Sequence, residues 1–190
     1  MELNQTLSNV IFPTKKKDAV GLDADYVAQY FHIFANQTTE SIFADKKVLI
    51  FGMPNLWRDI DSQQLEQIIA SKDALMATGL DAIHIVSPFE TYTLAAYEAQ
   101  TLYHLQYISD ANLEFTESLG MKTKITDQSY VGKGETCWRY AILVENKVIT
   151  RMWQEDGYDS TFTALTSYPP MSKTRPTDIL RDLNTATGGT

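Results

Sequence analysis

The first candidate for a chemically active residue is an aspartate at the start of a helix pattern. Residues 46–72 read as a buried strand, a Gly-x-Pro turn and an amphipathic helix that begins near Asp61. The N-terminus of a helix carries unpaired backbone N–H groups and the positive end of the helix dipole, which stabilise a carboxylate by roughly 0.3–1 kcal/mol. We therefore expect Asp61 to cap this helix or to serve there as a fixed anion.

The only thiol is the second candidate. Cys137 is the single cysteine of the chain, which excludes an intramolecular disulfide. It lies two residues before Arg139 in a strand pattern, so alternation predicts both side chains on one face of the strand. A neighbouring guanidinium would lower the pKa of the thiol. No helix N-terminus is expected beside it, however, and a small buried apolar residue is the favoured interpretation.

The remaining polar candidates carry weaker signals. Ser62 has no recognisable His and Asp partners that would make it a nucleophile. His32, His84 and His104 lie far apart in apolar contexts without metal-ligand spacing. We therefore expect neither a metal nor a cofactor.

The composition indicates one soluble globular domain. The 190 residues are 44% hydrophobic and 21% charged, which suits a single domain over 1–190 with residues 184–190 as a frayed tail. The net charge of −8 argues against a nucleic-acid partner, because such proteins present a basic face. The sequence shows neither a secretion signal nor an apolar run of the ~18 residues that a membrane span needs, so we expect a cytoplasmic protein.

Alternating strand and helix patterns must position these residues. Apolar runs predict strands at 48–51, 82–86 and 102–108, a hairpin with arms 138–143 and 148–153, a short edge strand at 10–12 and a strand at 30–34. Helices are predicted at 38–43, 61–78, 93–100, 110–119 and 176–183, with loops at 13–25 and 154–173. This order predicts an α/β domain of three layers around a mixed sheet.

Four segments resemble, in their order and spacing, the peroxiredoxins (redoxins), in particular the atypical branch that takes electrons from glutaredoxin or thioredoxin. The segments are Phe-Ala-Asp-Lys-Lys-Val-Leu-Ile-Phe-Gly-Met-Pro at 43–54, Asp-Ala-Ile-His-Ile-Val-Ser-Pro-Phe at 81–89, and residues 112–121 and 134–146. They span residues 39–157, and residues 174–183 resemble the family's closing helix. The resemblance implies a thioredoxin-like (peroxiredoxin-type) three-layer sandwich with a central mixed sheet.

The resemblance also assigns roles to individual residues. The family's active-site motif, Pro-x-x-x-Thr-x-x-Cys, corresponds here to Pro54-Asn-Leu-Trp-Arg58-Asp-Ile-Asp61. It implies that Pro54 is retained, that Arg58 replaces the threonine, that Asp61 replaces the peroxidatic cysteine, and that Arg139 matches the catalytic arginine. Peroxide reduction by this route requires a thiolate that becomes a sulfenic acid and is then reduced by a thiol. A carboxylate cannot complete that cycle, so we expect the peroxidase reaction to be absent at Asp61.

Two structural interpretations of Asp61 remain open. The first is a carboxylate that caps its helix and neutralises Arg139, filling a defunct pocket. The second is an anion-accepting pocket, in which Arg58 and Arg139 outweigh Asp61 and hold a small carboxylate, phosphate or sulfur oxyanion beside the helix N-terminus.

The predicted function is that of a binding or interaction module that acts as a homodimer. Trp57, Phe89 and Trp138 are candidates for core packing or for the dimer contact. The alternative is a thiol-dependent antioxidant peroxiredoxin that reduces hydrogen peroxide or alkyl hydroperoxides with Cys137. Glutaredoxin or thioredoxin would be a partner only in that case.

Overall fold

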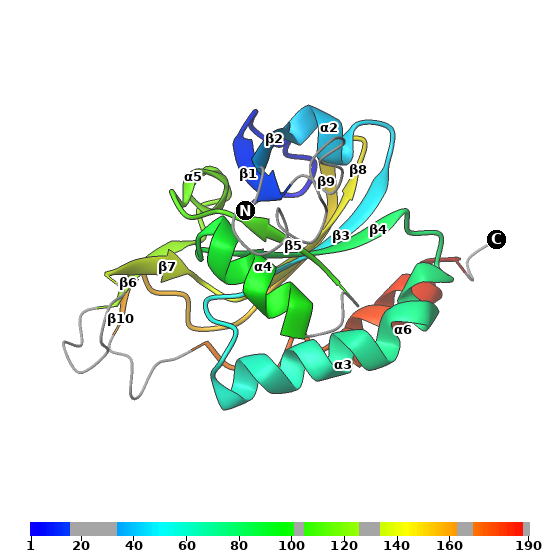
Figure 1. Cartoon of the computed structure of the whole chain (residues 1–190). Coiled ribbons are helices and arrows are strands. Elements are labelled where there is room, and N and C mark those ends of the chain that lie inside the picture. Colours follow the sequence, from blue (N-terminus) through cyan, green and yellow to red (C-terminus); the bar gives the residue numbers. More distant parts are fainter. Residues whose placement is uncertain (16–33, 101–104, 126–133, 163–168, 188–190) are drawn as a thin grey trace.

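A mixed sheet of five strands forms the centre of the protein (Figure 1). The computed structural model describes residues 1–15, 34–100, 105–125, 134–162 and 169–187. The strand order is β5-β4-β3-β8-β9, with bounds β3 Lys47–Gly52, β4 Ala82–Ser87, β5 Gln106–Ser109, β8 Tyr140–Glu145 and β9 Val148–Gln154. Strands β3, β4 and β5 are parallel, whereas β8 and β9 run antiparallel to their neighbours. The predicted α/β class and mixed sheet are confirmed.

The sheet separates two hydrophobic clusters, and β3 shows why. Its residues Val48 and Ile50 belong to the first cluster, and Leu49 and Phe51 belong to the second. Successive side chains of a strand point to opposite faces, so a strand in the middle of a covered sheet must be apolar throughout. The uninterrupted apolar run of the sequence is thus the signature of a central strand.

Helices and shorter segments cover the two faces. The second cluster is completed by side chains of α3 (Asp59–Met76), α4 (Thr91–Gln100) and α6 (Pro176–Thr187), and α3 and α6 lie side by side (Figure 1). The first is completed by the N-terminal segment, β1 (Ile11–Lys15), α2 (Thr39–Phe43) and α5 (Glu114–Ser118). Thr38 is the N-cap of α2 and accepts a hydrogen bond from the backbone N–H of Ser41.

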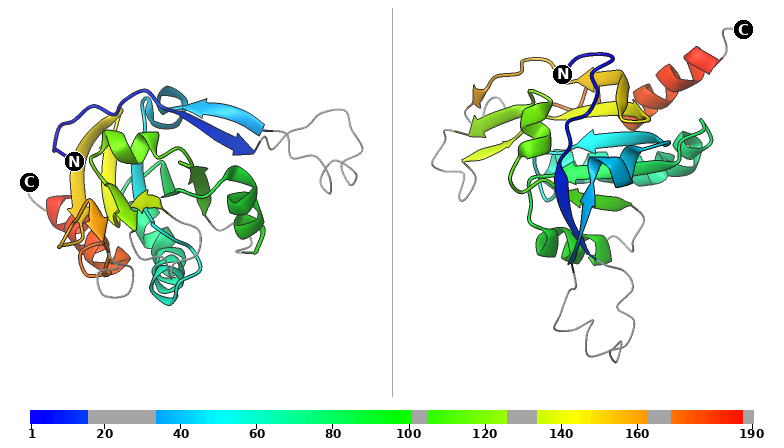
Figure 2. Two further views of the ribbon diagram at one scale, coloured as in Figure 1. Left: turned by 90° about the vertical axis from the view of Figure 1, so that its left-hand side faces the viewer. Right: turned by 90° about the horizontal axis from the view of Figure 1, so that it is seen from above.

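Two small sheets flank the central one. Strand β1 pairs with β2 (Phe34–Thr38) in a ribbon that reaches away from the central sheet (Figure 2). Strands β10 (Thr161–Phe162), β6 (Lys122–Ile125) and β7 (Glu135–Cys137) form the second small sheet. The sequence patterns missed β6, β7 and β10, which are short and largely polar. The strand predicted at 30–34 lies outside the described residues except for Phe34, where β2 begins.

Several predicted boundaries need correction. Strand β8 begins at Tyr140, so Trp138 and Arg139 form a break between β7 and β8 instead of continuing a strand. Helix α5 covers only Glu114–Ser118 of the predicted 110–119. Helix α6 continues to Thr187, well into the predicted frayed tail.

The ends of the hairpin and of the chain also bear on the fold. The β8–β9 turn is made by Asn146 and Lys147, both with positive φ, 46° and 69°, which matches the twist of a tight hairpin. The N-terminal segment pairs with the start of edge strand β9 through a bridge between Thr6 and Val148.

Among the described residues, no helix has the length and hydropathy to cross a membrane.

Candidate functional site

Asp61 lies in the first turn of α3 but does not occupy the cap position. Arg58 is the N-cap residue, with extended backbone (φ −77°, ψ 150°), and its side chain makes no capping hydrogen bond. The turn before it is held by Asn55, whose Oδ1 accepts from the backbone N–H groups of Leu56 (2.7 Å) and Trp57 (3.0 Å). The prediction that Asp61 caps the helix is therefore wrong. The carboxylate is three residues inside, where the dipole still favours a negative charge.

Asp61 and Arg139 form a buried ion pair. The Arg139 Nη2 atom lies 2.6 Å from Asp61 Oδ1, and both side chains have an exposed fraction of 0%. Arg139 comes from the break between β7 and β8, so an irregular connection places it against the first turn of α3. Two fully buried charges persist only when each is paired and hydrogen-bonded. The structure thus brings together the two residues that the sequence assigned to one site.

Arg139 has further partners within the chain. Its Nη1 donates to Gln64 Oε1, and its Nε donates to the Pro169 carbonyl oxygen at 3.3 Å. The guanidinium therefore contacts α3 twice and the segment that leads to α6 once. Arg58, the third charge predicted for the site, is half-buried at the start of α3.

Gln64 extends the hydrogen bonds to the C-terminal part of the chain. Its Nε2 donates to both the carbonyl oxygen and Oγ1 of Thr174, each at 3.0 Å. Gln64 and Thr174 both have an exposed fraction of 0%. Because the amide oxygen accepts from Arg139 and the amide nitrogen donates to Thr174, both ends of the Gln64 side chain are fixed.

A second buried carboxylate, Glu155, closes this network. It accepts hydrogen bonds from the backbone N–H groups of Ser172, Lys173 and Thr174, and from the hydroxyls of Ser172 (2.6 Å) and Thr174 (2.8 Å). Burial alone would raise the pKa of Glu155, but the bonds from Ser172, Thr174 and Lys173 outweigh it and leave the pKa below its ordinary value. Glu155 is therefore ionised near neutral pH and organises three consecutive residues.

Sequence reasoning missed Gln64, Thr174 and Glu155. Gln64 lies three residues after Asp61, which places both on one side of a helix, so helical spacing could have identified it. Glu155 comes from the region predicted as a loop and Thr174 from the predicted start of the closing helix, and nothing in the local sequence indicates that they meet.

Cys137 lies apart from this network. It ends β7, is 1% exposed, and packs in the first hydrophobic cluster with Trp138 and Tyr140. Arg139, in contrast, reaches α3, which packs with the second cluster. The prediction that Cys137 and Arg139 share a strand face is wrong, because the strand is interrupted between Cys137 and Tyr140. The favoured interpretation of Cys137 as a small buried packing residue fits this position.

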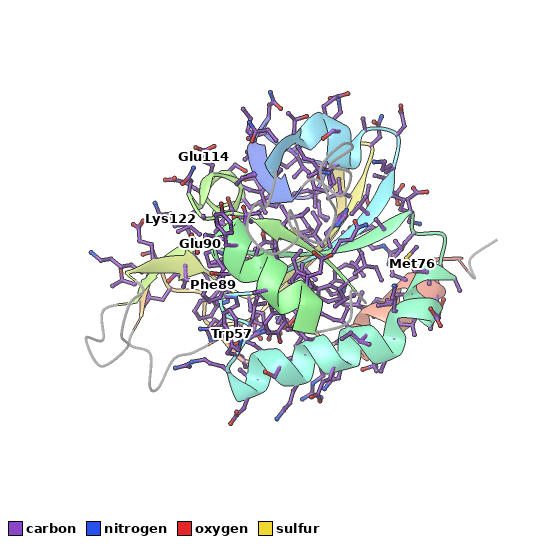
Figure 3. The ribbon with its side chains drawn as sticks, in the orientation of Figure 1. Trp57, Met76, Phe89, Glu90, Glu114 and Lys122 are labelled. Carbon is purple, nitrogen blue, oxygen red and sulfur yellow. The ribbon has the colours of Figure 1, made fainter. Side chains whose placement is uncertain are left out.

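An aromatic cluster lies beside the start of α3. Trp57 is 50% exposed and makes edge contacts with Phe89 (ring centroids 4.9 Å apart) and Tyr97 (5.2 Å). Figure 3 shows Trp57 and Phe89 near the N-terminal end of α3 and next to α4. Tyr97 donates its hydroxyl to the Leu56 carbonyl oxygen at 3.1 Å. Burial, and secondarily the charge of Asp61, raises the pKa of Tyr97, so the cluster adjoins the ion pair.

The other predicted residues within the described ranges have structural positions, whereas His32 and His104 lie outside those ranges. Trp138 is 2% exposed and donates its Nε1 to the Glu155 carbonyl oxygen, so it belongs to the core. Pro54 is buried in the turn after β3, and its carbonyl oxygen accepts from Thr136 Oγ1. Ser62 Oγ donates to the Leu56 carbonyl oxygen. Among the described residues, His, Cys, Asp and Glu side chains form no group suited to a metal ion.

Comparisons with known proteins agree with this architecture. The Redoxin family profile matches residues 33–166. Peroxiredoxin y4vD of Sinorhizobium fredii is 28% identical over 151 residues, which cover 78% of this chain and 77% of that protein.

Two solved structures extend the likeness to nearly the whole chain. The crystal structure of reduced Prx3 from Vibrio vulnificus in complex with hydrogen peroxide is 26% identical, with a TM-score of 0.72, and the match covers 96% of this chain and 99% of that one. The Plasmodium falciparum antioxidant protein, a 1-Cys peroxiredoxin, has 22% identity and a TM-score of 0.77, with 97% and 99% covered. The thioredoxin-like, peroxiredoxin-type fold is thereby confirmed, and the chain belongs to the Redoxin family.

Proposed function

We propose that this redoxin has lost thiol peroxidase activity and serves as a binding or interaction module, with Asp61 in the position of the peroxidatic cysteine. One observation carries the proposal: the guanidinium of Arg139 is bound at 2.6 Å to a carboxylate that is itself fully buried. A carboxylate there holds the charge that a thiolate would hold, but it cannot be oxidised and regenerated by thiols.

The buried pair supports the interpretation in which Asp61 neutralises Arg139. An external anion would have to displace Asp61 from Arg139, which also donates hydrogen bonds to Gln64 and Pro169. We therefore infer that the anion-accepting pocket is filled by the chain's own carboxylate. Only a variant without that carboxylate, such as Asp61→Ala, would leave a place for a small oxyanion such as formate.

Peroxide consumption tests the proposal. Purified protein is mixed with hydrogen peroxide and excess dithiothreitol, and loss of peroxide is followed beside a protein-free control. We expect no catalysed loss from the natural chain or from Cys137→Ser, because Cys137 is 1% exposed and packs in the first hydrophobic cluster. We expect turnover to appear in Asp61→Cys combined with Arg58→Thr. Turnover by the natural chain that disappears in Cys137→Ser would overturn the proposal and support the antioxidant alternative.

We further propose that the module is a cytoplasmic homodimer whose contact includes Trp57. Its support is that a large aromatic side chain is 50% exposed within a cluster of aromatic rings. Sedimentation analysis should show a dimer for the natural chain and a monomer for Trp57→Ser. Leu3→Ser is the matched control, since Leu3 is 56% exposed and lies in the N-terminal segment. A natural chain that sediments as a monomer would contradict the dimer without affecting the peroxidase result.

A further inference from the structure

The segment Pro169–Thr174, which we call the strap, lies against the buried ion pair and leads into α6. Hydrogen bonds attach it at both ends. The Pro169 carbonyl oxygen accepts from Arg139 Nε, and Thr174 accepts two bonds from Gln64 Nε2. The strap is thus hydrogen-bonded to Arg139 itself and to Gln64, which also binds Arg139.

The other hydrogen bonds of the strap go mostly to one carboxylate, that of Glu155. Three consecutive backbone N–H groups, of Ser172, Lys173 and Thr174, point to the two oxygens of Glu155, at distances of 2.8–3.1 Å. The hydroxyls of Ser172 and Thr174 bind the same carboxylate. Glu155 is 1% exposed, whereas Ser172 and Lys173 are exposed. Water can therefore reach the donors if the carboxylate no longer holds them.

Apolar packing holds the neighbouring helix, whereas the strap is held by the hydrogen bonds described above and by the burial of Pro169 and Thr174. Ile179 and Leu183 of α6 belong to the second cluster, and Trp153 Nε1 donates to Asp182 Oδ2 at 2.9 Å. Within the part of the chain that the structure describes, neither cluster takes a buried member from residues 169–175. The strap can accordingly detach while α6 remains packed.

We propose that Glu155 is the latch of this strap, which closes over Arg139 and opens as a local unit without unfolding of the sheet. When the strap opens, the Pro169 carbonyl oxygen leaves Arg139 Nε and the Gln64 amide loses its bonds to Thr174. Solutes then gain access to the Arg139 guanidinium. Local opening of this kind costs less than global unfolding where the attachment is polar and part of the segment, here Ser172 and Lys173, is solvent-exposed. The proposal does not depend on whether the protein reduces peroxides.

Hydrogen exchange measured on the natural full-length chain is the first test. The amides of Ser172, Lys173 and Thr174 should exchange at least about ten-fold faster than those of Leu49 and Ile50 in β3, with rates that depend little on added denaturant. Exchange of both groups at the same rate and with the same denaturant dependence would show that the strap opens only with the whole domain, and would overturn the proposal.

Removal of the latch is the second test. In Glu155→Gln, exchange of the strap amides should rise by a further factor of about ten while the β3 amides remain unchanged. Phenylglyoxal, which modifies accessible arginines, should label Arg139 faster in this variant than in the natural chain. Asp156→Asn is the matched control: it removes the exposed ion pair with Lys173 and leaves Glu155 in place. Equal acceleration in both variants, or acceleration that extends to β3, would refute the latch.

If Glu155→Gln does not yield folded protein, Thr174→Val provides the same information. It deletes one hydroxyl that Glu155 and Gln64 both use but keeps the carboxylate. Faster exchange at Ser172 and Lys173 with an unchanged β3 supports the strap. Unchanged exchange throughout contradicts it.

Discussion

Two regions of this molecule bury polar groups in opposite ways. In the Asp61–Arg139 network, each charge has a partner and each amide end of Gln64 is hydrogen-bonded. On the other face of the sheet, Tyr140 Oη and His84 Nδ1 are buried with no hydrogen-bond partner among the described residues. Neutral polar atoms can be buried unpaired at a moderate cost, whereas ionised groups cannot. We therefore expect the loss of either charge of the Asp61–Arg139 pair to lower stability strongly. The stability of the region around Tyr140 and His84 should instead depend on protonation of His84 and on the space beside the Tyr140 ring.

The largest effect should follow from breaking the ion pair. Asp61→Ala leaves the Arg139 guanidinium buried without its carboxylate, and we expect the free energy of unfolding to fall by about 3–5 kcal/mol. Denaturant titration measures the change. Asp156→Asn, which breaks an exposed ion pair with Lys173, should cost at most about 1 kcal/mol.

A double variant sharpens this result. Asp61→Leu combined with Arg139→Met removes both charges and replaces them by apolar side chains, so much of the lost stability should return. If the double variant is less stable than Asp61→Ala, the geometry of the network matters more than the burial of an unpaired charge.

A smaller, pH-dependent effect is expected from His84. Burial, and secondarily the charge of Lys46, lowers its pKa from 6.5 to about 4 in the folded protein. The unfolded chain therefore binds a proton between pH 6.5 and 4 that the folded protein does not, and the free energy of unfolding falls as the pH falls through this window. The shift corresponds to about 3 kcal/mol at most.

Comparison with His84→Phe isolates this contribution. The difference in unfolding free energy between the natural chain and the variant should be constant above pH 7 and should change by up to about 3 kcal/mol by pH 4. Parallel pH profiles for the two proteins would show that His84 does not remain neutral in the folded state.

The smallest effect concerns the shape of the region around Tyr140. A Cβ added at Gly52 would lie 2.1 Å from Cε1 of the Tyr140 ring, which covers the glycine. Gly52→Ala should therefore cost about 1–3 kcal/mol, because the ring must leave its position in a packed core. Thermal unfolding measures the loss. In a Tyr140→Leu background the alanine should cost less, and an equal cost in both backgrounds would contradict the steric explanation.

The fold was largely predictable because its central elements have simple physical signatures. The apolar run at 48–51 indicates a strand covered on both sides, and Asn146 with Lys147 suits the turn of a hairpin. The small sheet of β6, β7 and β10 was missed, since its strands contain two to four residues and β10 pairs with β6 from far along the sequence.

The site was predictable only in part. Resemblance to a known motif brought Asp61 and Arg139 together, and the ion pair bears this out. The alternation argument for Cys137 failed because it assumes a continuous strand, and the chain is irregular at Trp138 and Arg139. The contacts of Glu155 with the strap are tertiary, so no local pattern encodes them.

The pairing of the first residues with β9 has a practical consequence for handling this protein. Backbone bonds from Asn4 to Ile149 and from Leu7 to Lys147 occupy one end of β9, which is the edge strand of the central sheet among the described residues. An open edge is a template for strands of other molecules. Deletion of the first seven residues would leave this end of β9 uncovered, so self-association of such a variant would arise from the exposed strand edge.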